Sequence, residues 1–315
     1  MPTKSKKRIP SELGIGLALT LEMGIFTFLS PHFLTPDNLL NISLQTSISA
    51  IIAIGMTFVI LTAGIDLSVG SLVALAGIAV TATLKTGLPI SVALPLALLA
   101  GLAAGAVSGA LAGMLITRFN ITPFIVTLAL MTIWRGMSFV VTEGRPVWDL
   151  PPKFSQLAVG RILAVPLPTL ITVLVFLVAH ISLTKTPFCR AVYAVGGNPE
   201  AARLAGIQTK AVLLAVYMIS GVMAATSGIL LAARVNSGQP NAGLMYELDA
   251  IAAVVVGGTS LFGGKGSVVG TLIGSFLIGV LRNGLNLLNV ESYIQQVVVG
   301  IVILLAVMID QSHKQ

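Results

Sequence analysis

Long apolar stretches alternate with short polar or charged segments along nearly the whole chain. Runs such as 89–117 and 268–281 are continuously apolar, whereas membrane β-strands alternate polar and apolar positions over about ten residues. A helix needs about 20 apolar residues to cross a hydrocarbon core of about 30 Å. The pattern therefore predicts an all-α, polytopic transmembrane bundle with about ten spans, at 11–30, 43–62, 67–84, 89–115, 121–142, 165–184, 210–233, 249–257, 268–287 and 292–309.

The composition excludes a soluble protein of this length. Hydrophobic residues make up 56% and charged residues 9% of the 315 residues, whereas soluble proteins carry about 25% charged residues. The single cysteine, Cys189, excludes a disulfide within the chain. The three histidines are widely separated, and no cluster has metal-ligand spacing. We therefore expect an integral membrane protein that holds no metal.

The net charge of +7 is explained by membrane topology and not by nucleic-acid binding. Lys and Arg lie near span ends, and no basic face carries stacking aromatics. With the N-terminus inside, eleven of the 18 Lys and Arg residues fall inside and five outside, which obeys the positive-inside rule. We expect one transmembrane domain, 1–315, with both termini cytoplasmic, cytoplasmic tails at 1–10 and 310–315, an outer loop at 143–164 and an inner loop at 185–209.

The inner loop contains the sequence GGNPEAARLAGI at 196–207, which predicts a two-turn helix at 199–205. Asn198 is a good N-cap, Pro199 suits the first helical position, and Glu200 complements the helix dipole. Gly206 suits the left-handed position that follows a helix. Such a helix either packs against the protein's own spans or docks on a cytosolic partner through its small apolar face, which comprises Ala201, Leu204 and Ala205.

A break between two spans falls at 63–68. Gly64 ends one helix, and Asp66 or Ser68 can cap the next. Plain capping is one interpretation, and a broken helix that lines a transport pathway is the other. Gly64 and the segment 69–72 recur 200 residues later as Gly264 and 269–272, so a duplicated half is an open possibility.

Two arginines lie inside predicted spans, where a charge is costly and normally has a partner. Arg135 and Arg282 both fall in the outer half of their spans, and Glu247 and Asp249 open the short eighth span at comparable depth. We expect ion pairs between these acids and arginines. The pairs would either hold the helices of the bundle together or give a polar lining near an outer gate.

Amide side chains cluster near the end of the chain, at Asn283, Asn286, Gln295 and Gln296. Amides bind hydroxyl groups without adding charge, which would suit a neutral solute such as a sugar. The alternative is hydrogen bonding between helices.

Motifs for catalysis are absent from the sequence. The glycine-rich segment 258–266 fails the phosphate-loop template, because position 259 is Thr and Gly266 follows Lys265. No serine-nucleophile elbow and no paired histidines for zinc occur. We therefore expect no catalytic residue, no metal and no cofactor in this chain.

Four stretches resemble the membrane permeases of bacterial ribose-type sugar ATP-binding cassette (ABC) importers, within the ribose and branched-chain amino acid permease superfamily. They are GMTFVILTAGIDLSVGS at 55–71, the loop at 196–207, YELDAIAAVVVGGTSL at 246–261, and the segment from GGKG at 263–266 to NGLNLL at 283–288. The resemblance covers about residues 32 to 310. It implies a permease subunit that carries a monosaccharide, most closely ribose, across the bacterial inner membrane.

The resemblance also implies partners. These are a cytoplasmic ABC ATPase that binds ATP and Mg²⁺, a periplasmic sugar-binding protein, and a second permease copy, either identical or related. The inner loop 185–209 matches the family's coupling loop, which meets the ATPase. The residues that inherit this role are Asn198, Pro199, Glu200, Ala201, Ala202, Arg203, Leu204 and Gly206.

Two further classes of protein stay open. A secondary transporter driven by an ion gradient would need a buried carboxylate, and Glu22 and Asp66 are the candidates within the membrane. A membrane enzyme would need a convergent set of acid, base or nucleophile residues, and the sequence shows none.

Overall fold

A computed structural model describes residues 11–312 of the chain. The described part is almost entirely helical. Its elements in chain order are α1 (Ser11–Leu29), α2 (Pro36–Leu61), α3 (Val69–Leu84), α4 (Ile90–Phe119), α5 (Pro123–Thr142), α6 (Pro152–Val159), β1 (Arg161–Ile162), β2 (Val165–Pro166), α7 (Leu167–Lys185), α8 (Pro187–Gly197), α9 (Pro199–Leu204), α10 (Thr209–Val235), α11 (Tyr246–Val256), α12 (Val268–Leu287) and α13 (Ser292–Ser312).

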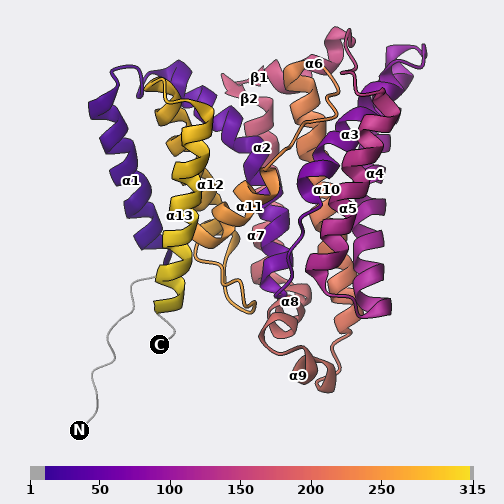
Figure 1. Cartoon of the computed structure of the whole chain (residues 1–315), viewed down its shortest axis with the longest axis vertical. Helices are drawn as coiled ribbons and strands as arrows, with labels where there is room; N and C mark the ends of the chain where they lie inside the picture. Colours follow the sequence, from indigo (N-terminus) through magenta and orange to yellow (C-terminus); the bar gives the residue numbers. More distant parts are fainter. Residues whose placement is uncertain (1–10, 313–315) are drawn as a thin grey trace.

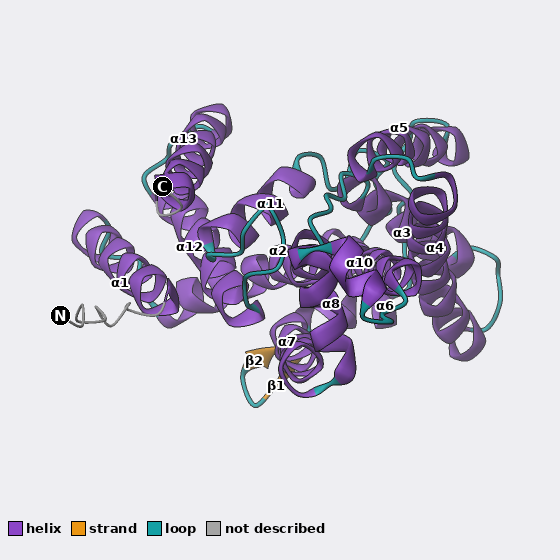
Figure 2. Cartoon of the chain, turned by 90° about the horizontal axis from the view of Figure 1, so that it is seen from below, coloured by secondary structure: helices purple, strands orange, loops and turns teal. Residues whose placement is uncertain are grey.

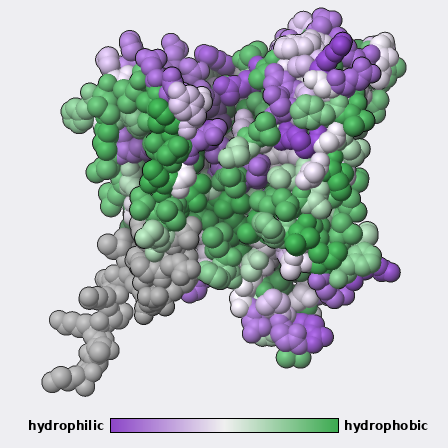
Figure 3. Space-filling view, in the orientation of Figure 1, coloured by the Kyte–Doolittle hydropathy of each residue, from purple (hydrophilic) through white to green (hydrophobic). Residues whose placement is uncertain are grey.

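The long helices form one bundle with two different ends (Figure 1). At the upper end lie α6 and the two-stranded antiparallel hairpin, in which Arg161 pairs with Pro166. At the lower end α8 and α9 project from the bundle, and α1 begins and α13 ends on this side too. Seen from below, α1, α12 and α13 lie on one side, and α3, α4 and α5 lie on the other (Figure 2). The space-filling view shows a hydrophobic belt between the two polar ends (Figure 3).

Within residues 11–312, seven helices are long and apolar enough to cross a membrane, against about ten predicted spans. Each predicted segment is helical, but α3 has 16 residues and α11 has 11. Within α13, Ser292–Leu305 forms a shorter apolar helix. The eighth span differs most from expectation, because the segment 236–245 ahead of α11 is not helical and α11 lies at mid-height of the bundle (Figure 1).

Both polar loops contain helices that the sequence pattern did not predict. The outer loop 143–164 holds α6, which is anchored by the fully buried ring of Phe154. The inner loop 185–209 holds α8 besides the predicted α9. Of the predicted tails, 1–10 lies outside the described residues, and α13 takes in residues up to Ser312.

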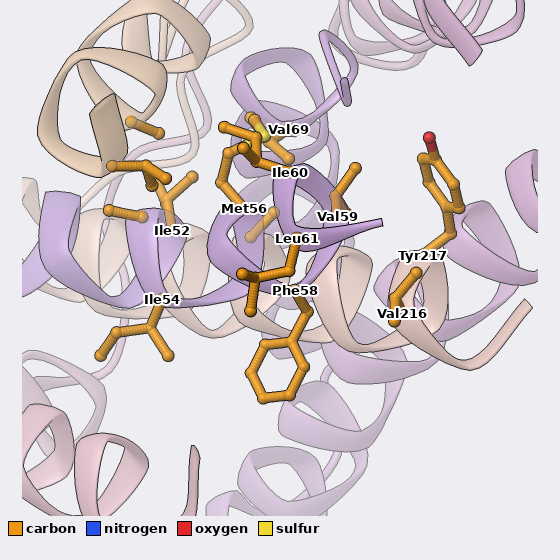
Figure 4. Close-up of a cluster of buried hydrophobic side chains, with 14 of the residues drawn as sticks. Ile52, Ile54, Met56, Phe58, Val59, Ile60, Leu61, Val69, Val216 and Tyr217 are labelled. Atoms are coloured by element: carbon orange, nitrogen blue, oxygen red, sulfur yellow. The ribbon is translucent and has the colours of Figure 1, made fainter. Parts of the chain in front are cut away.

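Helix α2 is the centre of the bundle. In its most apolar window 83% of the residues are buried, against 6% for α1, which lies at the edge. Side chains on all sides of α2 belong to the main hydrophobic cluster (Figure 4). This burial explains why α2 is apolar all round instead of amphipathic.

Helices α4 and α10 pack backbone to backbone. A glycine ridge, comprising Gly101, Gly105, Gly109 and Gly113, follows the four-residue repeat that places residues on one helix face. A Cβ atom on Gly105 would overlap the Gly221 carbonyl of α10, and the reverse also holds. Small residues that let helices approach closely are typical of membrane interfaces, where lipid provides no hydrophobic drive for association.

Candidate functional site

The lower end of the molecule presents α9 as predicted. Asn198 is its N-cap, and the Asn198 Oδ1 atom accepts hydrogen bonds from the backbone N–H groups of Glu200 and Ala201, both at 3.0 Å. Pro199 occupies the first turn, and Gly206 follows the helix with φ +85°. The cap satisfies two N–H groups that a helix this short leaves free, which stabilises it by about 1 kcal/mol.

One face of α9 is anchored and the other is free. Ala202 is 4% exposed and belongs to the main hydrophobic cluster. Leu204 is 79% exposed, and Ala201 and Ala205 are exposed beside it. The apolar face therefore does not pack against the described helices of this chain.

An exposed ion pair joins successive turns of α9. The Arg203 Nη2 atom lies 2.6 Å from the Glu200 Oε1 atom. The hydrogen bond from Arg203 lowers the pKa of the Glu200 carboxyl, and the same bond raises the pKa of Arg203. Both groups are therefore charged at neutral pH.

The break between α2 and α3 centres on Asp66, which is 2% exposed. The Asp66 Oδ1 atom accepts hydrogen bonds from the Ser68 N–H at 3.0 Å and the Ser68 hydroxyl at 2.6 Å. The Asp66 Oδ2 atom accepts a third from Ser220 of α10 at 2.8 Å. The carboxylate thus combines local capping with a tie to another helix. Asp66 and Ser68 were predicted from their place in the break, whereas Ser220 was not, because nothing in the chain order indicates that contact.

The two arginines inside spans have different partners. The Arg282 Nη2 atom lies 2.5 Å from the Asp249 Oδ1 atom, which confirms one expected ion pair and joins α12 to α11. Arg135 forms no ion pair within residues 11–312. Its Nη1 atom donates instead to the carbonyl oxygens of Pro240 at 2.8 Å and Ala242 at 2.7 Å. A non-helical segment leaves such carbonyls without helical partners, and in a membrane they must be satisfied by other protein groups.

Glu247, the other acid of the α11 start, lies against α3. A Cβ atom on Gly70 would overlap the Glu247 Oε2 atom and approach the Gly243 carbonyl to 2.5 Å. Gly70 therefore makes the space that lets the α11 start pack on α3. In the sequence Gly70 stands out only as part of the repeat at 69–72, and no local pattern indicates its contact with Glu247.

A small cavity lies beside the segment 236–245, between α3 and α10. Its volume is about 160 Å³. Small residues such as Gly77 and Gly228 form its sides, and Ser237, Gln239 and Tyr246 bring polar groups to its edge.

The predicted amides make bonds between helices. Asn283 of α12 and Asn38 of α2 exchange two hydrogen bonds, of 3.0 Å and 2.9 Å. The Asn286 Oδ1 atom accepts a bond from Gln295 of α13 at 2.7 Å. Both amides therefore hold α12 to its neighbours, which is the structural alternative that the sequence left open.

Groups suited to binding ions or metals are few in the described residues. No set of three or more His, Cys, Asp or Glu side chains is placed to hold a metal ion there. The Glu22 Oε2 atom is buried and has no hydrogen-bond partner within residues 11–312.

In the described part of the chain, seven helices are long and apolar enough to span a membrane, which indicates a multi-pass membrane protein. Its non-helical segments with polar residues inside the bundle and its exposed, cap-stabilised helix α9 are typical of the transporter class. The family model described as "Branched-chain amino acid transport system / permease component" matches residues 38–307, and the chain belongs to this family.

Three relatives illustrate the similarity. The chain is 48% identical to the ribose import permease protein of Bacillus subtilis, over 97% of this chain and 94% of the relative. It is 49% identical to the ribose import permease protein of Escherichia coli K12, over 95% and 93%. It is 37% identical to the D-allose transport system permease protein of the same organism, over 95% and 91%. No solved structure matches the chain.

Proposed function

We propose that this chain is the membrane permease subunit of an ABC importer that carries ribose into the cytoplasm. The observation that carries the proposal is the identity of 49% to a ribose import permease over 95% of the chain. Identity to the D-allose permease is lower, at 37%. The chain itself performs no catalysis, since the energy comes from ATP hydrolysis on another subunit.

We place the protein in the bacterial inner membrane as a single permease domain with its lower end in the cytoplasm. The positive-inside bias supports this orientation. In this arrangement the segment 236–245 and α11 together make one crossing, and α3 and α13 make two more. The chain then crosses the membrane ten times, and both termini are cytoplasmic.

We assign the docking of the ATPase to α9. An exposed leucine on a small apolar face, flanked by the Glu200–Arg203 pair, gives a compact surface for a partner. The partner ATPase supplies the sites for ATP and Mg²⁺, a periplasmic binding protein delivers the sugar at the upper end, and a second permease copy completes the pore. Movement of α9 then drives alternating access of the bundle.

The transport pathway is assigned to the polar residues at and beside the non-helical segments 62–68 and 236–245. Helix ends recur at binding sites in transporters because their termini offer partial charges to a solute. The amides of Asn283 and Asn286 bond α12 to its neighbours, just as the Arg282–Asp249 pair bonds α12 to α11. The pathway residues are Asp66, Ser68, Arg135, Glu247, Asp249, Arg282, Asn283 and Asn286.

The proposal is tested by Leu204→Asp in the complete importer, with the ATPase and binding protein encoded by the same transport system. We expect membrane insertion to be normal, co-purified ATPase to fall at least tenfold and uptake of labelled ribose to be lost. Leu163→Asp is the matched control, since Leu163 is 95% exposed at the opposite end and should leave ATPase recovery unchanged. Full ATPase recovery with Leu204→Asp would contradict the docking assignment.

The ion-gradient alternative rests on the unpartnered Glu22 Oε2 atom. Uptake that continues after a protonophore collapses the gradient, and that stops when ATP is depleted, supports the importer. Glu22→Gln should then transport ribose at the wild-type rate. Loss of uptake with the protonophore and with Glu22→Gln, while ATP remains, would establish the alternative.

A further inference from the structure

Three backbone segments meet without intervening side chains at the lower end of the bundle. They are the end of α2, the end of α8 and the glycine-rich segment 257–267 ahead of α12. A Cβ atom on Gly196 would overlap the Leu61 carbonyl oxygen and lie 2.7 Å from the Gly264 nitrogen. Its neighbour Gly197 has nothing within 4 Å of a Cβ atom. Only one of two consecutive glycines is therefore required by packing.

The glycine-rich segment is fixed to both of the other segments. The Gly264 N–H donates to the Leu61 carbonyl at 2.9 Å. A Cβ atom on Gly263, which has φ +78°, would lie 2.7 Å from the Gly196 carbonyl oxygen and 2.8 Å from the Ala63 nitrogen. At Gly196 and Gly264 the segments thus touch backbone to backbone, and no flexible side chain lies between them there to absorb a displacement.

Two further contacts hold α8 to the same partners. The Tyr193 hydroxyl donates to the Gly266 carbonyl at 2.8 Å. The rings of Phe188 on α8 and Phe58 on α2 stack with their centroids 6.3 Å apart. Helix α8 is therefore attached near its start and near its end, so it moves with α2 and with the segment ahead of α12.

We propose that Gly196 is a positioning residue that transmits displacement of α9 at once to two connections between helices, 62–68 between α2 and α3 and 257–267 between α11 and α12. Only Asn198 separates α8 from α9, so a force on α9 reaches Gly196 within one turn. From there it acts on Leu61, which leads through the break at 62–68 into α3, and on Gly264, which leads into α12. The inference rests on the proposed docking of an ATPase at α9.

The test compares Gly196→Ala with Gly197→Ala in the complete importer in proteoliposomes. We expect Gly196→Ala to retain co-purified ATPase and basal ATP hydrolysis. Stimulation of hydrolysis by ribose-loaded binding protein and uptake of labelled ribose should each fall at least tenfold. Gly197→Ala should match wild type in all four measurements. Loss of ATPase with Leu204→Asp but not with Gly196→Ala separates docking from transmission.

A second pair of variants decides the question if Gly196→Ala does not assemble. Tyr193→Phe removes one hydrogen bond and keeps the ring, and Tyr293→Phe, at a tyrosine that is 65% exposed, is its control. We expect Tyr193→Phe to reduce stimulated hydrolysis and uptake about threefold with normal ATPase recovery, and Tyr293→Phe to have no effect. Uptake within 20% of wild type for Tyr193→Phe, or within twofold for an assembled Gly196→Ala, would overturn the proposal.

Discussion

The backbone leaves the helical state inside the bundle at both ends, and the two places are held together in different ways. At the lower end, 62–68 and 257–267 meet α8 through glycine backbone atoms. At the upper end, Arg135 bonds the segment 236–245 to α5 through two carbonyls, and Arg282 bonds the start of α11 to α12 through Asp249.

The difference indicates different mechanical roles. A backbone contact transmits displacement directly but tolerates no added atom, because interiors are close-packed. An arginine has a long side chain and five donors, so it bridges a variable gap and re-forms its bonds after a movement. The lower end is therefore suited to passing motion on, and the upper end to opening and closing. If so, removing either of the two upper tethers, the bonds of Arg135 to the segment 236–245 and the Arg282–Asp249 pair, should destabilise the bundle.

The largest loss of stability is expected for Arg282→Met. The substitution leaves the carboxylate of Asp249, whose side chain is 12% exposed, without its partner. Because the Arg282 side chain is 36% exposed, we expect a cost of about 3 kcal/mol, the lower limit for removing one member of a fully buried pair. We expect a lower Tm of the detergent-solubilised protein, measured by loss of the monodisperse peak after heating.

The double variant Arg282→Met, Asp249→Leu is the control for that experiment. Replacing a whole buried pair by apolar residues is often neutral. We expect it to recover most of the lost Tm while ribose uptake stays impaired, because the tether is still absent. Equal Tm values for the single and double variants would show that the ion pair does not account for the loss.

A smaller loss is expected for Arg135→Ala. The change leaves the carbonyls of Pro240 and Ala242 without their donor, and hydrogen bonds to a charged group contribute about 1.5–3 kcal/mol. Arg135→Lys should lose less, because an ammonium group can still reach one carbonyl. Limited proteolysis at 236–245 should rise in the order wild type, Lys, Ala. Arg145→Ala, at an exposed residue just beyond α5, is the control and should behave as wild type.

The hydrophobic pattern predicted the helices well where an uninterrupted apolar run spans the membrane. The predicted helix bounds were less accurate where tertiary contacts satisfy polar groups within a helix or crossing. The span was predicted to start near 43 because Asn38 interrupts the apolar run. Helix α2 in fact begins at Pro36, since the Asn38 amide is paired with Asn283 and can be buried there. The segment 236–245 was not predicted as an irregular crossing, since its stability depends on the donors of Arg135.

In the candidate site, too, local contacts were predicted from the sequence and contacts between distant residues were not. Asn198, Pro199 and Gly206 predicted α9 correctly, because capping is a local interaction. The tie from Ser220 to Asp66 connects residues 154 positions apart, and no local pattern contains it. The glycine ridge of α4 was present in the sequence as a repeat of four, and it would have predicted the close packing on α10.

The smallest effect is expected for the N-cap of α9, which probes the lower end without touching the contact at Gly196. Asn198→Ala removes the acceptor of two backbone hydrogen bonds and should destabilise α9 by about 1 kcal/mol. Asn198→Asp keeps an acceptor there and is the matched control. Because only the docking helix loosens, we expect the Tm to be unchanged. Uptake of ribose should fall two- to fivefold for Asn198→Ala and be near normal for Asn198→Asp.

Raising the ATPase concentration should restore uptake by Asn198→Ala. It should not restore uptake by Gly196→Ala, in which docking is intact and transmission is lost. If excess ATPase restores both variants equally, Gly196 and Asn198 both act on docking alone, and the contrast between a transmitting lower end and an opening upper end fails.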